Sequence, residues 1–544
     1  MLNKLLHNTQ PLFQIPYKLL TCTRLENQKK SLVMADKSGF SKKINEGYSC
    51  KGENIVLGCG MLNGEPVTDA VVRIPLKTLN RHGLIAGATG TGKTKTLQVI
   101  SEQVSNLGIP VLLMDVKGDL SGIARPGEEK PFIKERHEKM GLPYVPKGYP
   151  VELMTLSKQD GVRLRATVSE FGPVLFSRIL DLNDTQGGVV SLIFKYCDDR
   201  KMPLLDLKDF KKVIQYITGE GKAEIEQEYG KVSTASTGTI LRKILEIEQQ
   251  GGELFFGELS FDIRDLMRKD KNGSGYINIV RLNDIQDRPK LFSTFMLSLL
   301  GEIYNQMPEK GDVSKPELVI FIDEAHLIFN EASKALLDQI ENIVKLIRSK
   351  GVGIFFVTQN PADIPNGVLA QLGLKVQHAL RAFTAVDRKA IKLAAENYPD
   401  SEFYKTDELI TSLGIGEAMV TALDEKGVPT PLAATLLRAP VSRMDILVQT
   451  EIDTINSSSD LVRKYKEEID RESAYEILGG KVTTPARKDT ERRRMGDGEM
   501  QTPVAPRSKT TTAHQKSELD PVIKVLTSAT FIRGVFGILS KTLR

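Results

Sequence analysis

Cysteine is scarce in this chain, and its few positions are scattered. The 544 residues include only four cysteines, Cys22, Cys50, Cys59 and Cys197. Their spacing matches no metal-ligand pattern, which excludes a metal site built on cysteine pairs. Thiols without a disulfide framework are typical of a reducing compartment, so we expect a cytoplasmic protein.

The chain also lacks long apolar runs, and it lacks acidic residues near its start. No stretch approaches the roughly 18–20 apolar residues of a membrane span. Residues 1–25 contain Lys4, Lys18 and Arg24 but no Asp or Glu. A clear signal peptide would need an apolar core and a small-residue cleavage site, and a transit peptide would carry more Arg and Ser. We therefore expect residues 1–50 to be a disordered or spurious extension, with Met34 as an alternative start.

Neither sign of charge is in large excess. Lys and Arg together number 74, Asp and Glu 69, and the net charge is +5. This weakly basic balance permits a nucleic-acid or anionic-membrane partner without indicating one. A hydrophobic content of 40% is enough for a large core, and the length allows two to four domains.

The strongest motif in the chain is a glycine-rich stretch at residues 87–94. It matches G-x-x-x-x-G-K-[ST], the phosphate-binding loop of nucleotide hydrolases, and it lies between an apolar strand pattern at 84–86 and a helical pattern from about Lys93. Its glycines let backbone N–H groups converge on phosphate oxygens, and the helix start adds its positive end. Lys93 is predicted to reach the β- and γ-phosphates, and Thr94 to hold Mg²⁺. The predicted nucleotide-binding residues are Gly87, Ala88, Thr89, Gly90, Thr91, Gly92, Lys93, Thr94 and Lys95.

A second signal is a buried-strand pattern that ends in two carboxylates. Residues 318–322 are all apolar, and Asp323, Glu324, Ala325 and His326 follow. Asp323 is predicted to hold Mg²⁺, directly or through water, and Glu324 to act as the general base toward the attacking water. His326 either senses the γ-phosphate or caps the following helix.

Two further strand patterns end in polar residues. The apolar run 109–114 leads into Asp115, Lys117 and Asp119, which we expect near the ligand-binding edge of a parallel sheet. The run 353–357 leads to Gln359, which is predicted to hydrogen-bond the attacking water or the γ-phosphate. Arg348 precedes this strand and is either an arginine finger for a neighbouring subunit or a helix-terminal cation, and Arg381 is a second finger candidate.

These patterns predict an α/β fold: a phosphate-loop core of mostly parallel sheet with helices on both faces. A mostly helical insertion is expected at 168–250, with a mobile polar loop at 233–238. The expected divisions are an extension at 1–50, a short β attachment at 51–80, the core at 81–440, a helical extension at 441–480, a disordered basic linker at 481–520 and a basic amphipathic helix at 521–544.

The combined motifs resemble the HerA/FtsK superfamily of ring ATPases, and most closely bacterial HerA-like helicase-domain proteins. The resemblance extends from about residue 55 to 478 and rests on RHGLIAGATGTGKT, MDVKGDLSGIA, LVIFIDEAHLIF, IRSKGVGIFFVTQNPADIP and VQHALRAFT. It implies a RecA-like core, a homohexameric ring, ATP bound between subunits, DNA in the pore, and an arginine finger acting in trans near Arg348. The N-terminal β portion is shorter than in the DNA-processing members.

Three functions follow from these patterns and the resemblance. The leading hypothesis is a Mg²⁺-dependent ATP hydrolase that moves double-stranded DNA. The second is a related ATPase that moves or assembles protein near a membrane, with 521–544 contacting a protein or an anionic membrane surface. The third is a slow nucleotide-dependent binding switch.

Overall fold

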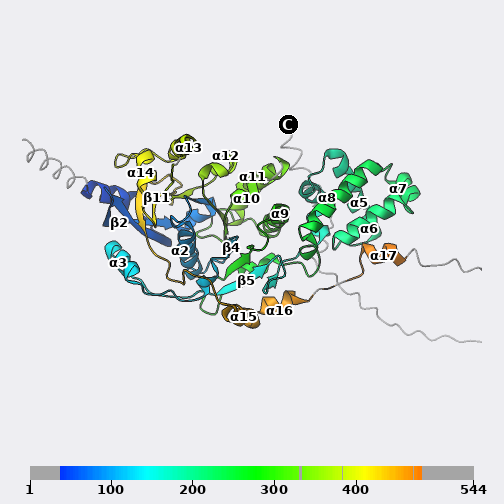
Figure 1. The fold of residues 1–544 in the computed structure, drawn as a ribbon, viewed down its shortest axis with the longest axis horizontal. Helices are drawn as coiled ribbons and strands as arrows, with labels where there is room; N and C mark the ends of the chain where they lie inside the picture. Colours follow the sequence, from blue (N-terminus) through cyan, green and yellow to red (C-terminus); the bar gives the residue numbers. More distant parts are fainter. Residues whose placement is uncertain (1–36, 330–333, 383, 468, 470, 481–544) are drawn as a thin grey trace, which may run out of the picture. The chain divides into compact units, whose positions relative to one another are not determined.

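The computed structural model describes residues 37–329, 334–382, 384–467, 469 and 471–480. Its centre is one twelve-stranded sheet (Figure 1). The strands in chain order are β1 (Asn54–Leu62), β2 (Glu65–Pro75), β3 (Gly83–Ala86), β4 (Val111–Asp115), β5 (Val151–Thr155), β6 (Val162–Arg163), β7 (Ile277–Arg281), β8 (Leu318–Ile322), β9 (Val352–Thr358), β10 (Leu374–Gln377), β11 (Glu417–Thr421) and β12 (Ala433–Leu437).

Most of the sheet is parallel. The spatial order is β2-β1-β12-β11-β10-β3-β9-β8-β4-β7-β5-β6, and every pairing from β10 to β6 is parallel. The phosphate-loop strand β3 is separated from β8 by β9, so an additional strand lies between the two motif-bearing strands. The expected RecA-like arrangement is thereby confirmed. The remaining strands, β11, β12, β1 and β2, extend the sheet by antiparallel pairing.

Both faces of the parallel region are buried. In β3, Leu84 and Ala86 belong to one hydrophobic cluster, and Ile85 belongs to another. Helix α2 (Lys93–Asn106) covers the Ile85 face, while α9 (Pro289–Gln306) and α11 (Lys334–Ile347) contribute to the opposite face. Burial on two sides explains why these strands read as continuous apolar runs without alternation.

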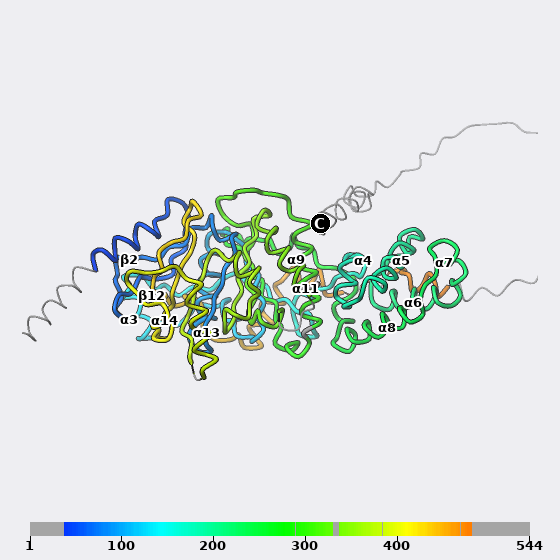
Figure 2. The backbone as a smooth tube through the Cα atoms, turned by 90° about the horizontal axis from the view of Figure 1, so that it is seen from above, coloured from blue at the N-terminus to red at the C-terminus, as the bar shows by residue number. Residues whose placement is uncertain are grey.

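The segment between β6 and β7 is helical, as expected. It contains α4 (Val168–Ile179), α5 (Asp184–Arg200), α6 (Leu207–Thr218), α7 (Lys222–Glu228) and α8 (Thr234–Gln249). In Figure 2 helices α5 to α8 lie together. Tilted and edge-on contacts among Phe176, Phe194 and Phe210 fix α4, α5 and α6 against one another.

The prediction of a mobile loop at 233–238 is wrong, because these residues begin α8. The Ser233 hydroxyl accepts a hydrogen bond from the Ser236 N–H and so caps the helix. The Thr237 and Thr239 hydroxyls donate to backbone carbonyls one turn earlier. Small polar residues satisfy helix termini as readily as they form loops, and composition alone does not separate the two.

The prediction that residues 1–50 are disordered or spurious is wrong for 37–50. Residues 37–47 form a helix, and Phe40, Ile44 and Tyr48 are buried against the antiparallel part of the sheet. The Tyr48 hydroxyl lies 2.8 Å from the carbonyl oxygens of both Val420 and Pro431. These contacts join the segment to the β11–β12 hairpin. Residues 1–36 lie outside the described chain.

The remaining helices lie at the sheet edges and after β12. They are α3 (Pro131–Met140), α10 (His326–Phe329), α12 (Asn366–Leu369), α13 (Ala385–Ala395), α14 (Thr406–Ser412), α15 (Gln449–Ser458), α16 (Asp460–Lys466) and α17 (Ala474–Gly480). α15 contacts β5, α16 contacts β6, and α17 packs on α6. None of the helices in the described residues is long and apolar enough to cross a membrane. The predicted linker 481–520 and helix 521–544 lie outside the described residues.

Candidate nucleotide-hydrolysis site

The glycine-rich loop follows β3 and leads into α2. Gly87, Gly90 and Gly92 adopt φ values of 149°, 78° and 116°, a region that residues with a Cβ rarely enter. A Cβ on Gly87 would lie 2.5 Å from the Cβ of His378. The loop therefore needs glycine at this position for both its backbone conformation and its packing.

Neighbouring strands hold this loop in place. The Gly87 N–H donates to the Thr358 carbonyl at 3.3 Å, and the Ala88 N–H donates to the Ala379 carbonyl at 2.8 Å. The first of these carbonyls belongs to β9, and the second lies just past β10. These two hydrogen bonds attach the loop to the strands on either side of β3.

Lys93 is buried at the start of α2, and its ammonium faces the loop. Its Nζ donates to the Gly87 carbonyl at 2.7 Å and to the Ala88 carbonyl at 3.3 Å. Burial lowers the pKa of Lys93, nearby Lys117 lowers it further, and the carboxylates of Glu324 and Asp323 oppose the change. The predicted phosphate lysine therefore shares an electrostatic environment with the predicted carboxylates.

The side chains of Thr94 and Lys95 lie in different surroundings. Thr94 is half-buried on the first turn of α2. The Lys95 ammonium instead donates to the Met444 carbonyl at 2.8 Å, in the segment after β12. Lys95 was predicted to bind nucleotide, but its side chain is occupied elsewhere, so only its backbone N–H, in the first turn of the helix, is suited to a phosphate.

Asp323 and Glu324 follow β8 at the carboxyl edge of the sheet. Asp323 is only 2% exposed, Glu324 is also buried, and Glu324 has a φ of 46°, unusual for a residue other than glycine. Burial raises the pKa of Asp323 to about 6, and the Lys117 ammonium opposes this. In the described chain, Asp323 Oδ2 and Glu324 Oε2 are buried without a hydrogen-bond donor.

Lys117 contacts both carboxylates. Its ammonium forms an ion pair with Glu324 Oε1 and lies 3.8 Å from Asp323 Oδ2. The loop that carries it is fixed by Asp115, whose carboxylate accepts hydrogen bonds from the N–H groups of Gly118, Asp119 and Leu120. Burial raises the pKa of Asp115 to about 7. The sequence predicted these charges near the site but assigned Lys117 no role in it.

Gln359 follows β9, between the phosphate loop and the two carboxylates in the sheet order. It is exposed at the same edge of the sheet. The turn after it is held by Asp363, which accepts hydrogen bonds from the Thr358 hydroxyl at 2.6 Å and from the Asn360 N–H at 3.2 Å. Asp363 is a positioning residue that the sequence reading missed.

The two candidate finger arginines lie at opposite ends of the sheet. Arg348 begins the turn η5 (Arg348–Lys350) before β9, so it is at the amino edge; its side chain is 46% exposed and 3.9 Å from Asp312 Oδ1. Arg381 follows β10 at the carboxyl edge and donates to the Thr411 carbonyl at 2.8 Å. The length of β9 separates Arg348 from its own site by roughly 20 Å.

Comparison with known proteins gives the family. The family model "Helicase HerA-like C-terminal" matches residues 61–542. The chain belongs to this family.

The HerA-like chain has several archaeal relatives. It is 22% identical over 352 residues to the DNA double-strand break repair helicase HerA of Sulfolobus acidocaldarius, covering 64% of each chain. It is 24% identical over 388 residues to a probable helicase of Methanocaldococcus jannaschii, covering 64% of this chain and 65% of the relative. The HerA-like chain thus spans just under two thirds of the length of these relatives.

Two solved structures match a large part of the chain. One is the bacterial conjugative coupling protein TrwBΔN70, with a TM-score of 0.48, 15% identity, and coverage of 75% of this chain and 94% of that chain. The other is VirB4 of Thermoanaerobacter pseudethanolicus, with a TM-score of 0.45, 16% identity, and coverage of 72% and 98%.

The residues of the HerA-like site fit a hard divalent cation. Two buried carboxylate oxygens lack a hydrogen-bond donor, and Thr94 places a half-buried hydroxyl on the first turn of the phosphate-loop helix. Mg²⁺ prefers such oxygen ligands and usually shares them with substrate phosphates. Thr94 and Asp323 are the residues suited to hold it.

Two histidines lie beside the site, and a third lies at the far end of β3. The sequence predicted no role for His378 or His82. His326 Nδ1 lies 3.2 Å from Glu324 Oε2, so His326 contacts the predicted base. Buried His378 lies under the phosphate loop, with Nε2 2.9 Å from the Thr96 hydroxyl, and burial lowers its pKa to about 4. His82 lies at the other end of β3 and is also buried. The only sequence signal for His378 was its place in VQHALRAFT.

Proposed function

We propose that this chain is a Mg²⁺-dependent ATP hydrolase that works as a homohexameric ring motor on double-stranded DNA. The observation that carries the proposal is the convergence of three motifs at one edge of the sheet. The phosphate loop follows β3, Gln359 follows β9, and Asp323 and Glu324 follow β8, and these three strands are neighbours. Ligands of open α/β sheets bind outside the carboxyl ends of the strands.

Each residue has a role that matches its chemistry. The loop N–H groups and Lys93 bind the phosphates of ATP, and Thr94 and Asp323 hold Mg²⁺. When bound, Mg²⁺ neutralises charge on the β- and γ-phosphate oxygens. Glu324 takes a proton from the attacking water, and Gln359 orients that water or the γ-phosphate.

Arg348 is proposed to act on the next subunit's ATP. Its position at the amino edge keeps it from its own site, and its side chain is exposed at the surface beside Asp312, where a neighbouring subunit could be reached. Arg381 is at the carboxyl edge beside its own phosphate loop and is bonded to backbone carbonyls. These positions favour Arg348 as the finger, which would stabilise transition-state charge.

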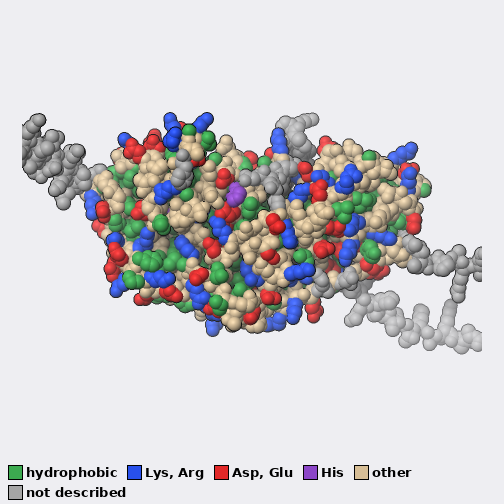
Figure 3. Space-filling model, viewed as in Figure 1, with side chains coloured by type: hydrophobic (Ala, Val, Ile, Leu, Met, Phe, Trp, Pro, Cys, Tyr) green, Lys and Arg blue, Asp and Glu red, His purple; other side chains and the backbone are tan. Residues whose placement is uncertain are grey.

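Double-stranded DNA is proposed as the substrate from the family and its relatives. The family description names a helicase, and the relatives' names describe DNA repair. On the face seen in Figure 3, basic and acidic side chains are interspersed, so that face offers no broad positive field. The alternative of a membrane contact rests on 521–544, outside the described residues.

The test is ATPase activity with and without duplex DNA for wild type, Lys93→Ala and Glu324→Gln, at two salt concentrations. We expect wild type to hydrolyse ATP, Glu324→Gln to bind ATP but turn over at least about 100-fold more slowly, and Lys93→Ala to lose binding. Lys139→Ala, an exposed residue on α3 paired with Glu135, is the control. Hydrolysis that persists in Lys93→Ala overturns the site assignment.

In the same experiment, the measurements with and without duplex DNA distinguish between DNA and protein as the substrate that is moved. A DNA motor should show stimulation by duplex and binding that weakens steeply with salt. ATP hydrolysis without either effect would favour a protein-moving ATPase, and slow turnover in all conditions would favour a nucleotide-dependent switch.

A further inference from the structure

Lys117 is held against the two carboxylates by the fold of its own loop. Gly118, with a φ of 77°, and the three N–H groups bound by Asp115 fix the turn after β4. The Lys117 side chain is 36% exposed, whereas the Glu324 side chain it contacts is 8% exposed. The backbone of Lys117 is therefore fixed, and its ammonium reaches into a buried acidic site.

The pairing covers the carboxylate of Glu324. One carboxylate oxygen contacts the Lys117 ammonium, and the other lies 3.2 Å from His326 Nδ1. An ammonium in contact with Oε1 occupies the position from which a water would approach that oxygen. Lys93 does not share this contact, because its ammonium is bonded to the carbonyls of the phosphate loop.

Binding of ATP and Mg²⁺ changes the balance of charges around Lys117. A divalent cation at Asp323 repels an ammonium located 3.8 Å from the same carboxylate. The γ-phosphate brings strong anionic acceptors to this edge of the sheet, and ADP does not. The Lys117 ammonium is carried on a flexible four-carbon stem, which allows it to move toward that negative charge.

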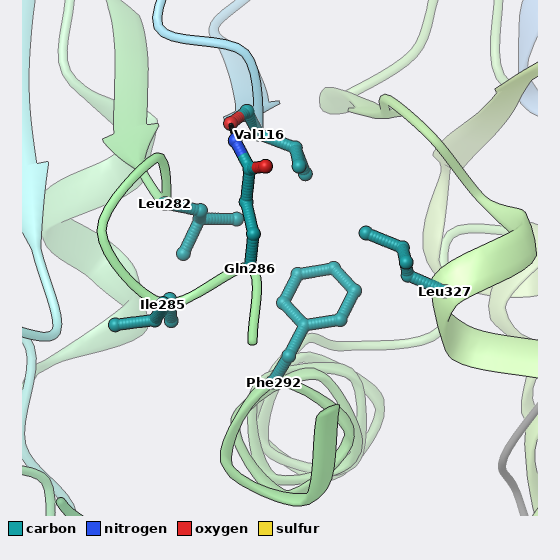
Figure 4. Close-up of a pocket in the computed structure, with 6 residues that line it drawn as sticks. All are labelled: Val116, Leu282, Ile285, Gln286, Phe292 and Leu327. Carbon is teal, nitrogen blue, oxygen red and sulfur yellow. Dashed lines mark hydrogen bonds between the residues drawn. The ribbon is translucent and has the colours of Figure 1, made fainter. Parts of the chain in front are cut away.

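An apolar pocket leaves room beside the two segments concerned (Figure 4). Val116, directly before Lys117, and Leu327, on α10 just after Glu324, face each other across it, with Phe292 of α9 below them. Leu282 and Ile285 complete its apolar wall. Gln286 also lines the pocket, and its Nε2 donates a hydrogen bond to the Val116 carbonyl, which holds the backbone next to Lys117. A movement that separates Lys117 from Glu324 is therefore a movement of the Lys117 side chain about a fixed backbone.

We propose that Lys117 is a γ-phosphate sensor that restrains the catalytic base. Without the γ-phosphate it pairs with Glu324 and keeps it from activating water. With MgATP bound, the Lys117 ammonium contacts the γ-phosphate oxygens and releases Glu324, so that the base becomes available only when a phosphate is present to be hydrolysed. This inference rests on the proposed ATPase function.

The test compares affinity for MgADP and for a non-hydrolysable Mg–ATP analogue in the full chain, by isothermal titration calorimetry. Lys117→Met keeps the length of the side chain and removes its charge. We expect it to weaken binding of the analogue by roughly 10- to 100-fold and to leave ADP binding within about twofold, because a charge-assisted bond to the γ-phosphate is lost. Lys117→Arg should restore most of the affinity for the analogue. Lys139→Met, at an exposed lysine, is the matched control.

A second measurement addresses the restrained state directly. Without nucleotide, Lys117→Met and Glu324→Gln should be non-additive in unfolding stability, because each breaks the same ion pair. Equal effects of Lys117→Met on ADP and the analogue, no effect on either, or additive stabilities would overturn the inference. Failure of wild type to bind any nucleotide would instead overturn the proposed function.

Discussion

His82 joins the helix before Arg348 to the strand that precedes Gln359. Its Nε2 lies 2.8 Å from the Val344 carbonyl, and its Nδ1 accepts a hydrogen bond from the Ile354 N–H at 3.1 Å. The neutral tautomer with a proton on Nε2 satisfies both contacts. Burial lowers the pKa of His82 to about 4, and the Arg348 guanidinium contributes to this.

The first prediction concerns the pH dependence of that contact. Folded His82 stays neutral down to about pH 4, while unfolded histidine takes up a proton near pH 6.5. The unfolded state therefore binds more protons as pH falls, and the stabilisation present above pH 6.5 is progressively lost. The destabilisation caused by His82→Gln should shrink by roughly 2 kcal/mol between pH 7 and pH 5 in urea unfolding. If the difference in unfolding free energy between wild type and His82→Gln does not change with pH, His82 is not buried in its neutral form.

The second prediction concerns the glycine that starts the phosphate loop. Gly87→Ala should destabilise the fold by about 1–3 kcal/mol and abolish nucleotide binding, because a Cβ conflicts with both its φ and His378. Gly188→Ala is the control, since Gly188 is inside α5 with open space around its Cβ position. There we expect no loss of binding and a stabilisation of about 0.5–1 kcal/mol. Thermal unfolding and nucleotide titration measure both effects.

The third prediction separates the two arginines. Arg348→Ala should retain ATP binding and lose roughly 1,000-fold in turnover, whereas Arg381→Ala should change turnover much less. Mixing Arg348→Ala with Glu324→Gln subunits should recover activity, because a mixed interface contains one intact base and one intact finger. If mixtures stay inactive although the subunits exchange, Arg348 does not act in trans.

The fourth prediction concerns the helix at 37–47. Tyr48→Phe removes the hydroxyl between the Val420 and Pro431 carbonyls and should cost about 1–2 kcal/mol of unfolding free energy. Tyr475→Phe, at a half-exposed tyrosine, should stay within about 0.5 kcal/mol. Denaturant unfolding of the two variants tests whether this N-terminal segment belongs to the folded core.

The sequence was sufficient for the parts of the fold that are local in the chain. The strands that precede Asp323 and Gln359 are short apolar runs followed directly by polar residues, and parallel pairing brings those ends to one edge. The helix at 37–47 could also have been recognised, since Phe40, Ile44 and Tyr48 recur at a spacing of four.

The rest depends on contacts between distant residues. The pairing of Lys117 with Glu324, and the hydrogen bonds of His82 to two separate elements, join positions hundreds of residues apart in the chain. Neither has a local pattern that distinguishes it from a solvated charge or a core histidine. Lys95 illustrates the opposite error, since a motif neighbour was assigned to the site although its side chain contacts Met444.

The shortness of β3 has a consequence for how sites communicate around a ring. Its four residues are all buried, it is paired on both sides, and it connects His82 at one end with the phosphate loop at the other. A close-packed strand of this kind transmits displacement with little compression. Loss of the γ-phosphate would then shift the contacts of His82 to Val344 and Ile354, just before and just after Arg348. In the proposed hexamer we expect this coupling to make turnover cooperative, with a Hill coefficient above one for ATP.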